Sequence, residues 1–173
     1  EEGVALREAG IKRPILILGS LYPFESTMAA IRYGLTTTVA SLEGARLIAR
    51  AAAAVSSFSS RKNSELACHL KVDTGMGRVG VRWPAGLEAA RYLQEAPGVR
   101  LEGVFTHLAR AEDDDAFSRA QLARFSQALR DVSALGIRLK WRHAANSAAA
   151  LRLPASRFDL VRPGLAAYGL LPG

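Results

Sequence analysis

The sequence predicts an α/β fold with a parallel sheet: a partial (β/α)8 barrel of the TIM type, with about six of its eight strands. Short apolar or β-branched runs alternate with helical patterns, which is typical of βα units. Polar residues cluster just after successive predicted strands, where barrels gather their active sites. The 173 residues are fewer than the roughly 250 of a complete barrel, so about two strands are absent.

Each predicted element follows from a local pattern. The continuous apolar run at Pro14–Gly19 is typical of a buried parallel strand. Strands are expected at Pro14–Gly19, Leu35–Ala40, Leu66–Val72, Leu101–Thr106, Arg138–Arg142 and Phe158–Val161. Helices are expected at Glu2–Ala9, Ser26–Tyr33, Ser41–Val55, Pro84–Glu95, Phe117–Leu135 and Ala145–Leu151. The polar stretch Ser56–Ser64 is expected to be a loop and the most flexible point of the chain.

An open, doubly wound sheet would show the same alternation of strands and helices. Such sheets commonly carry a glycine-rich phosphate loop after the first strand, but Gly19–Tyr22 reads GSLY and lacks that pattern. A barrel also explains why the polar residues form one ring. We therefore expect a single domain, residues 1–173, in the form of a partial barrel.

Composition excludes several classes of protein. The net charge is +7, from 23 basic and 16 acidic residues, but the basic residues are scattered and aromatics make up only 7%, so a nucleic-acid partner is not expected. No apolar run approaches the roughly 20 residues of a membrane helix. The acidic start, Glu1-Glu2, does not resemble a signal peptide. The single cysteine, Cys68, fits a reducing compartment, and we expect a cytoplasmic protein without a metal site.

The segment Leu66–Asp73 is predicted to place a lysine on the inner face of the barrel. Side chains alternate across a strand, so one face carries Leu66, Cys68, Leu70 and Val72, and the other carries Ala67, His69, Lys71 and Asp73. An inward lysine is costly unless it is paired, and the simplest pairing for Lys71 is with Asp73 or another carboxylate. The turn that follows contains two glycines and delivers Arg78 to the strand end, where it can clamp an anion.

Further polar residues follow the later strands. His107 comes directly after one strand, and the acidic run Glu112–Asp115 beyond it is interpreted as a solvated loop. Ser147 begins a short helix, where it either binds a phosphate through free N–H groups or only caps the helix. Arg162 and Gly164 follow the last predicted strand. Barrels commonly hold phosphate after their last two strands, so these two segments together favour a phosphate-bearing ligand.

Four motifs in order resemble the alanine racemases, a family of pyridoxal 5'-phosphate (PLP) enzymes that interconvert L- and D-alanine. They are HLKVDTGMGRVGV (His69–Val81), LEGVFTHLA (Leu101–Ala109), HAANSAAALR (His143–Arg152) and FDLVRPGLAAYGL (Phe158–Leu170). The resemblance covers essentially the whole chain and includes the opening LREAGIKRPILILG. One motif can arise by accident, but four at the right spacing identify the chain as similar to this family.

The resemblance implies roles for four catalytic residues. Lys71 is the lysine that is carbamylated in many members, which makes it an anion that can pair with Arg78. Arg78 lies near the phenolic oxygen of PLP and the substrate carboxylate. Arg162 contacts the pyridine nitrogen and, because a guanidinium does not readily release its proton, leaves that nitrogen unprotonated. His107 links this arginine to a catalytic tyrosine.

The resemblance also implies how the cofactor is held. Ser147 and the backbone at Gly164 and Leu165 form the phosphate cradle, with Asn146 and His143 in supporting roles. Arg78 and Arg162 contact the cofactor as well. The expected cofactor is PLP, the substrate is alanine, and the full-length protein is expected to be a homodimer that supplies D-alanine for peptidoglycan.

Two parts of the family pattern are missing from the sequence. The family's Schiff-base lysine lies in a motif like VKANAYGHG on the first barrel strand, and its catalytic tyrosine lies in a C-terminal domain and acts across the dimer interface. We therefore expect the 173 residues alone to be inactive. A smaller departure is Leu108–Glu112, where relatives often have Phe-Ala-x-Ala-Asp. A serine or broad-specificity racemase and a non-catalytic PLP-binding barrel remain alternatives, although Lys71 favours alanine.

Overall fold

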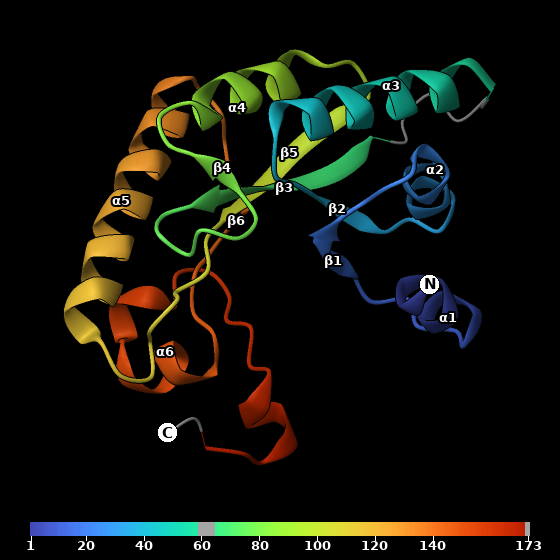
Figure 1. Cartoon of the computed structure of the whole chain (residues 1–173). Coiled ribbons are helices and arrows are strands. Elements are labelled where there is room, and N and C mark those ends of the chain that lie inside the picture. Colours follow the sequence, from blue (N-terminus) through green and yellow to red (C-terminus); the bar gives the residue numbers. More distant parts are fainter. Residues whose placement is uncertain (59–64, 172–173) are drawn as a thin grey trace.

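The chain folds as a curved parallel sheet with helices along its outer side (Figure 1). The computed structural model describes residues 1–58 and 65–171. The strands run in the order β1 (Leu16–Ser20), β2 (Thr36–Val39), β3 (Leu66–Asp73), β5 (Val99–Phe105) and β6 (Trp141–His143), and the short β4 (Val81–Arg82) pairs with β3 off this path. All the pairings are parallel. The predicted α/β parallel architecture is therefore confirmed.

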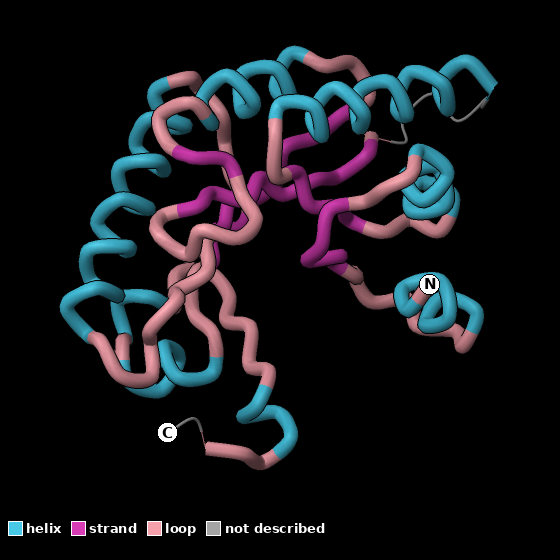
Figure 2. The backbone as a smooth tube through the Cα atoms, in the orientation of Figure 1, coloured by secondary structure: helices cyan, strands magenta, loops and turns pink. Residues whose placement is uncertain are grey.

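The helices are α1 (Glu2–Glu8), α2 (Phe24–Arg32), α3 (Leu42–Phe58), α4 (Gly86–Glu95), α5 (Asp115–Ala134) and α6 (Ser147–Arg152), followed by the 3-10 turns η1 (Pro154–Ser156) and η2 (Leu165–Tyr168). Figure 2 shows that α3, α4 and α5 lie outside the strands, while the C-terminal segment crosses below them. The predicted loop Ser56–Ser64 overlaps the end of α3, and its remainder, residues 59–64, lies outside the described residues. No helix in the described ranges is long and apolar enough to cross a bilayer.

One predicted strand is wrong. Phe158–Val161 contains no strand; Phe158 has a φ of 45°, in the left-handed region that extended strands do not use. This segment contacts the end of β6 without forming a ladder. The Asp159 N–H donates to the Arg142 carbonyl, and the Asp159 carboxylate accepts hydrogen bonds from the backbone and side chain of Arg142. The sixth strand is β4, whose two residues were too few to predict.

The core lies between the outer face of the sheet and the helices. Cys68, Leu70 and Val72 of β3 are at most 1% exposed and belong to the same apolar cluster as Leu93 of α4 and Phe125 of α5. The predicted division of the faces of β3 is therefore correct. Burying one such side chain stabilises the fold by about 1.5–3 kcal/mol, so this layer fixes the position of the strand that carries Lys71.

The inner face carries polar residues in aligned rows. In one row Lys71 pairs with Phe105, and Phe105 pairs with His143 across β3, β5 and β6. One step toward the start of the strands, His69 pairs with Gly103. Because all the strands are parallel, residues that follow them meet at one edge of the sheet. That edge is the expected position of an active site.

Candidate active site at the carboxyl edge of the sheet

Lys71 is buried near the end of β3 and is only 8% exposed. Within the described residues it forms no ion pair, so the simple pairing with Asp73 is not found. Burial lowers the pKa of Lys71, the charges of Arg78 and Arg162 lower it further, and Asp73 only opposes the change. The site around this lysine is therefore rich in cations.

Asp73 is occupied by the turn that follows β3. Its carboxylate accepts hydrogen bonds from the N–H groups of Gly75 and Gly77, each at 2.9 Å to the nearer oxygen. Burial alone would raise the pKa of Asp73, but these backbone donors lower it below its usual value. Gly75 and Gly77 have φ angles of +141° and +69°, which suit glycine. The turn thus leads the chain to Arg78, which is exposed at the mouth of the site.

Arg162 is fixed on the inner side by three hydrogen bonds. One Nη donates to Nδ1 of His143 at 2.7 Å, and the other donates to the carbonyl oxygens of Thr106 at 2.7 Å and Ala144 at 3.0 Å. Burial lowers the pKa of Arg162 to about 10, so the guanidinium remains charged at neutral pH. Three of its five N–H groups are used in this way, which leaves donors for a ligand.

Phe105 forms a platform between the three basic residues of this face. Its ring stacks on His143 with centroids 4.6 Å apart and an interplanar angle of 6°. The Arg162 guanidinium carbon lies 5.2 Å from the ring centre, and Lys71 Nζ lies 5.7 Å from it. Phe105 was not among the residues expected from the sequence, although its inward place between Lys71 and His143 follows from the register.

His107 follows β5 at the same edge. Burial, followed by the charges of Arg162, Lys71 and Arg78, lowers the pKa of His107 to about 4. Its imidazole is therefore neutral at pH 7, with one nitrogen able to accept a proton or a hydrogen bond. Figure 1 shows β3, β5 and β6 side by side, which brings the loops that carry these residues together.

A buried glutamine on α5 holds two of these loops. Gln121 is fully buried, and its amide donates to the carbonyl of His107 at 3.1 Å and to the hydroxyl of Thr74 at 3.2 Å. Its oxygen accepts the N–H of Ala109 at 2.9 Å. The turn after β3 and the loop after β5 are therefore fastened to one side chain. Gln121 was not expected from the sequence. A polar residue on the buried face of the amphipathic α5 could have indicated that this side chain has a structural role.

Two helical N-termini meet at Ser147. Asn146 caps α6 by accepting the N–H of Ala149 at 2.9 Å, so Ser147 is the first residue of the helix and not its cap. The Ser147 hydroxyl accepts the N–H of Ala166 at 3.1 Å, and Gly164 and Leu165 begin the turn η2. Backbone N–H groups at helix N-termini favour phosphate. The predicted cradle residues are thus placed together.

The acidic run before α5 lies at the surface, as expected for a solvated loop, and it also makes specific contacts. Asp114 caps α5 by accepting the N–H of Phe117, and Asp113 pairs with Arg110 at 2.7 Å. Glu112 contacts the Asn146 amide at 3.4 Å. In the described part of the chain, no group of three or more His, Cys, Asp or Glu side chains is placed to hold a metal ion. The donors of the site are instead the Arg162 guanidinium, Lys71 and the backbone N–H groups near Ser147, which suit an anion with a phosphate group.

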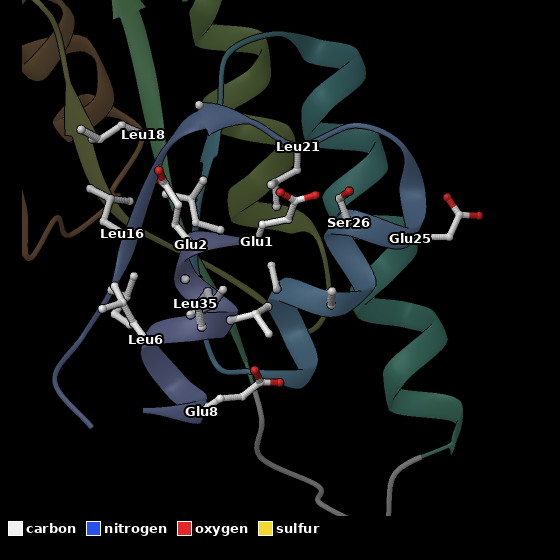
Figure 3. Close-up of a pocket in the computed structure, with 18 residues that line it drawn as sticks. Glu1, Glu2, Leu6, Glu8, Leu16, Leu18, Leu21, Glu25, Ser26 and Leu35 are labelled. Atoms are coloured by element: carbon white, nitrogen blue, oxygen red, sulfur yellow. The ribbon is translucent and has the colours of Figure 1, made fainter. Parts of the chain in front are cut away.

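A separate cavity, away from this sheet edge, lies between α1, β1 and α2. Its volume is about 930 Å³, and its lining includes Leu6, Leu16, Leu18 and Glu25 (Figure 3). Its lining consists of apolar residues, Ser26 and glutamates and includes no Lys, Arg or His, so this cavity presents no basic side chain to a phosphate (Figure 3). Its size alone does not make it the candidate site.

Comparison with known proteins gives one consistent family. The model of the alanine racemase N-terminal domain matches residues 1–172. The alanine racemase of Carboxydothermus hydrogenoformans is 44% identical over 173 residues, which cover 99% of this chain and 45% of the relative, and that of Nostoc sp. is 37% identical. The chain thus spans less than half the length of these relatives.

Solved structures agree with this result. The alanine racemase of Clostridium difficile 630 superposes with a TM-score of 0.90 at 31% identity, covering 99% of this chain and 44% of that one. The Bacillus anthracis enzyme, solved with bound L-Ala-P, gives a TM-score of 0.84 at 34% identity over 99% of this chain and 43% of its own. The fold, the ordered motifs and these matches together show that the chain belongs to the alanine racemase family, within its N-terminal domain.

Proposed function

We propose that these 173 residues contribute part of the PLP-binding barrel domain of an enzyme that interconverts L- and D-alanine. The observation that carries the proposal is the Arg162 guanidinium, fixed by three hydrogen bonds at the same sheet edge as the hydrogen bond between Ser147 and Ala166. Similar structures described as complexes with cycloserine and L-Ala-P support an amino-acid site. The residues present fit a ligand with a phosphate at one end and an acceptor nitrogen at the other.

PLP, when bound, would withdraw electrons from the α-carbon of the amino acid and so make its proton labile. Arg162 would donate a hydrogen bond to the ring nitrogen. Its pKa of about 10 lies well above that of a pyridine nitrogen, so it would hold its proton. The ring would therefore remain a moderate electron sink, which favours return of the proton over transamination.

The cations at the mouth would bind the acidic groups. Arg78 would contact the phenolic oxygen of the cofactor and the carboxylate of alanine. Lys71, whose pKa is lowered by burial and by two arginines, would be carbamylated: its neutral amine would add CO2 and release one proton. A carbamate would replace a cation by an anion and pair with Arg78, which removes the repulsion among the three basic groups.

The remaining polar residues would position these groups. Ser147, Gly164 and Leu165 would hold the phosphate, and Asn146 would keep the start of α6 in place as its cap. His107, neutral at pH 7, would accept a hydrogen bond and lie between Arg162 and a tyrosine of a second domain, so that it links the two side chains. That tyrosine would come from the partner in a cytoplasmic homodimer that supplies D-alanine for peptidoglycan.

The 173 residues alone are proposed to be inactive. PLP catalysis requires a lysine amine placed to react with the cofactor. Lys71 is the single lysine at the sheet edge among the described residues, and it is proposed to be carbamylated there; Lys12 and Lys140 are exposed elsewhere. D-Alanine formed by this segment with PLP alone would contradict the proposal.

The activity is tested with the gene product that contains this chain. Supplied with PLP and L-alanine, it should form D-alanine, and L-serine should be racemised more slowly. Arg162→Met should lower kcat on the order of 100-fold, since it removes a donor aimed at the cofactor. The matched variant Arg157→Met removes an exposed arginine of the same segment and should leave kcat unchanged. Absence of D-alanine, or faster turnover of L-serine, would overturn the assignment.

A further inference from the structure

A chain of buried polar groups runs behind Arg162 into the sheet. Nδ1 of His143 accepts a hydrogen bond from the Arg162 guanidinium at 2.7 Å, and Nε2 of His143 lies 2.9 Å from Nδ1 of His69. Nε2 of His69 faces the Glu102 carboxylate at 3.7 Å. Both imidazoles are at most 3% exposed. None of the catalytic roles proposed above uses His69 or Glu102.

We propose that Glu102 and His69 are positioning residues that fix the tautomer of His143 and, through it, the orientation of the Arg162 guanidinium. The inference rests on the proposed function only for its consequence in catalysis. The hydrogen-bond chain itself is a property of the protein without cofactor or substrate.

The direction of the chain follows from its arginine end. A guanidinium can only donate, so Nδ1 of His143 must accept, and a neutral His143 then carries its proton on Nε2. That proton is donated to His69, whose Nδ1 must accept. His69 therefore also carries its proton on Nε2, on the side of Glu102. Every ring nitrogen has one role, and the roles are consistent along the whole chain.

Glu102 supplies the matching charge at the other end. The distance of 3.7 Å is too long for a direct hydrogen bond, but a carboxylate there favours an N–H over a lone pair on the facing nitrogen. Arg100 pairs with Glu102 and with Glu65 at 3.2 Å, so the carboxylate is held in turn. The chain is thus polarised from a carboxylate to a guanidinium.

The backbone is shaped to bring Glu102 to this position. Leu101 pairs with Cys68, whereas Gly103 pairs with the next residue, His69, so Glu102 is an extra residue in β5. Such a bulge redirects side chains and is common beside active sites. Leu101 remains in the outer core, while the Glu102 carboxylate reaches the inner face beside His69.

Gly103 provides the space for the His69 ring. A Cβ on Gly103 would lie 2.7 Å from three atoms of that imidazole, closer than any ordinary contact. The ring therefore rests directly against the backbone of β5. An alanine at this position would displace His69 without removing any hydrogen-bonding group.

A second proton on either imidazole ring would break the series of hydrogen bonds between His69, His143 and Arg162. A second proton on His69 or His143 would place two N–H groups face to face, or an N–H against the Arg162 donor. The groups that face the two rings are Arg162 and Asp159 toward His143, and Glu102 and Arg100 toward His69. Burial lowers the pKa of His69 to about 4 and that of His143 to about 2, in agreement with two neutral rings.

Histidine ¹⁵N NMR on the cofactor-free gene product tests the tautomers directly, with His69→Gln and His143→Gln variants used to assign the two rings. Both rings should carry the proton on Nε2 and should not titrate between pH 5.5 and 8. A proton on Nδ1 of either ring, or titration near pH 6.5, would overturn the proposal. This result does not depend on whether the protein racemises alanine, so it can fail separately from the proposed function.

Variants test the assignment to positioning. Glu102→Gln removes the charge that faces His69, and Gly103→Ala displaces the His69 ring. Both should disturb the His69 tautomer and lower kcat about tenfold, with KM for alanine within about twofold. Val104→Ala, on the outer face of the same strand, should reduce stability but leave the tautomers and kcat unchanged. Unchanged tautomers in both Glu102→Gln and Gly103→Ala would remove these positions from the chain.

Discussion

The two ends of the sheet differ in how completely their side chains are partnered. At β3, β5 and β6 the outer face is packed by helices, and the inner face carries a continuous set of polar contacts from Glu102 to Arg162. At β1 and α1 the apolar side chains Leu18 and Leu6 are 46% and 45% exposed beside a cavity of about 930 Å³.

This difference shows that the volume of a cavity does not indicate which region of the molecule carries the functional groups. The larger cavity is lined by apolar and acidic groups, whereas the candidate site is a narrow edge where several buried polar residues converge. Converging groups require a rigid support, and the packed core behind β3 provides it. A ligand site is therefore better recognised from the arrangement of donors and charges than from the empty space nearby.

The largest expected effect contrasts the cores of the two ends. Leu70→Ala removes a fully buried side chain from β3 and should lower the free energy of unfolding by about 2–5 kcal/mol. Leu18→Ala, on the exposed side of β1, should cost less than about 1 kcal/mol. Urea unfolding of the 173-residue segment, in which Leu18 has this exposure, measures both, and equal losses would remove the contrast between the two ends.

The pH dependence of stability should come from the packed end. His69 and His107 have folded pKa values of about 4, and His143 has one of about 2, all below the unfolded value near 6.5. The unfolded chain therefore takes up protons first as the pH falls, and stability decreases below pH 6.5 by up to about 1.4 kcal/mol per unit for each ring. Urea midpoints at pH 7, 6 and 5 should fall in that order, and the slope should be smaller in His69→Gln.

The positions of the loops after β3 and β5 should depend on the Gln121 side chain. Gln121→Leu leaves the Ala109 N–H and the His107 carbonyl without their partner, at a cost of about 1–3 kcal/mol, and should also lower kcat. Gln127→Leu alters an exposed position of the same helix and should change stability by less than about 0.5 kcal/mol. Thermal melts compare the two variants; similar shifts would show that Gln121 does not fasten the loops.

The smallest effect compares two helix caps. Asn146→Ala at the packed end and Ser41→Ala at the other end each remove an oxygen that accepts a backbone N–H, for about 1 kcal/mol of stability. Only Asn146→Ala should also weaken PLP binding, because it loosens the start of α6 beside Ser147. Equal PLP affinity in the two variants would argue against a cradle at Ser147.

Local patterns in the sequence were sufficient for most of the fold. The alternation in β3 predicted which side chains enter the core and that Lys71 lies on the inner face, and His107 was expected directly after β5. Arg162 reaches the same sheet edge from a segment that is not a strand. The predicted strand at Phe158–Val161 was wrong, because Phe158 has a left-handed backbone and the segment is held by hydrogen bonds that Arg142 donates to the Asp159 carboxylate. Such long-range contacts leave no periodic signal.

The site was predicted less completely than the fold. Gln121, Phe105 and the pair His69 and Glu102 act through partners distant in sequence, so a reading of single strands does not reveal them. Glu102 was hidden in particular, because the extra residue in β5 shifts the alternation by one. The position of a bulge depends on how two strands pair, and the residues of one strand alone do not determine it.

A crystal structure of the gene product with PLP tests the central claim most directly. The phosphate should lie against Ser147 and the N–H groups after Gly164, and the ring nitrogen should face Arg162. Density for PLP in the cavity between α1, β1 and α2, or a phosphate away from Ser147, would contradict the assignment of function to the packed end of the sheet.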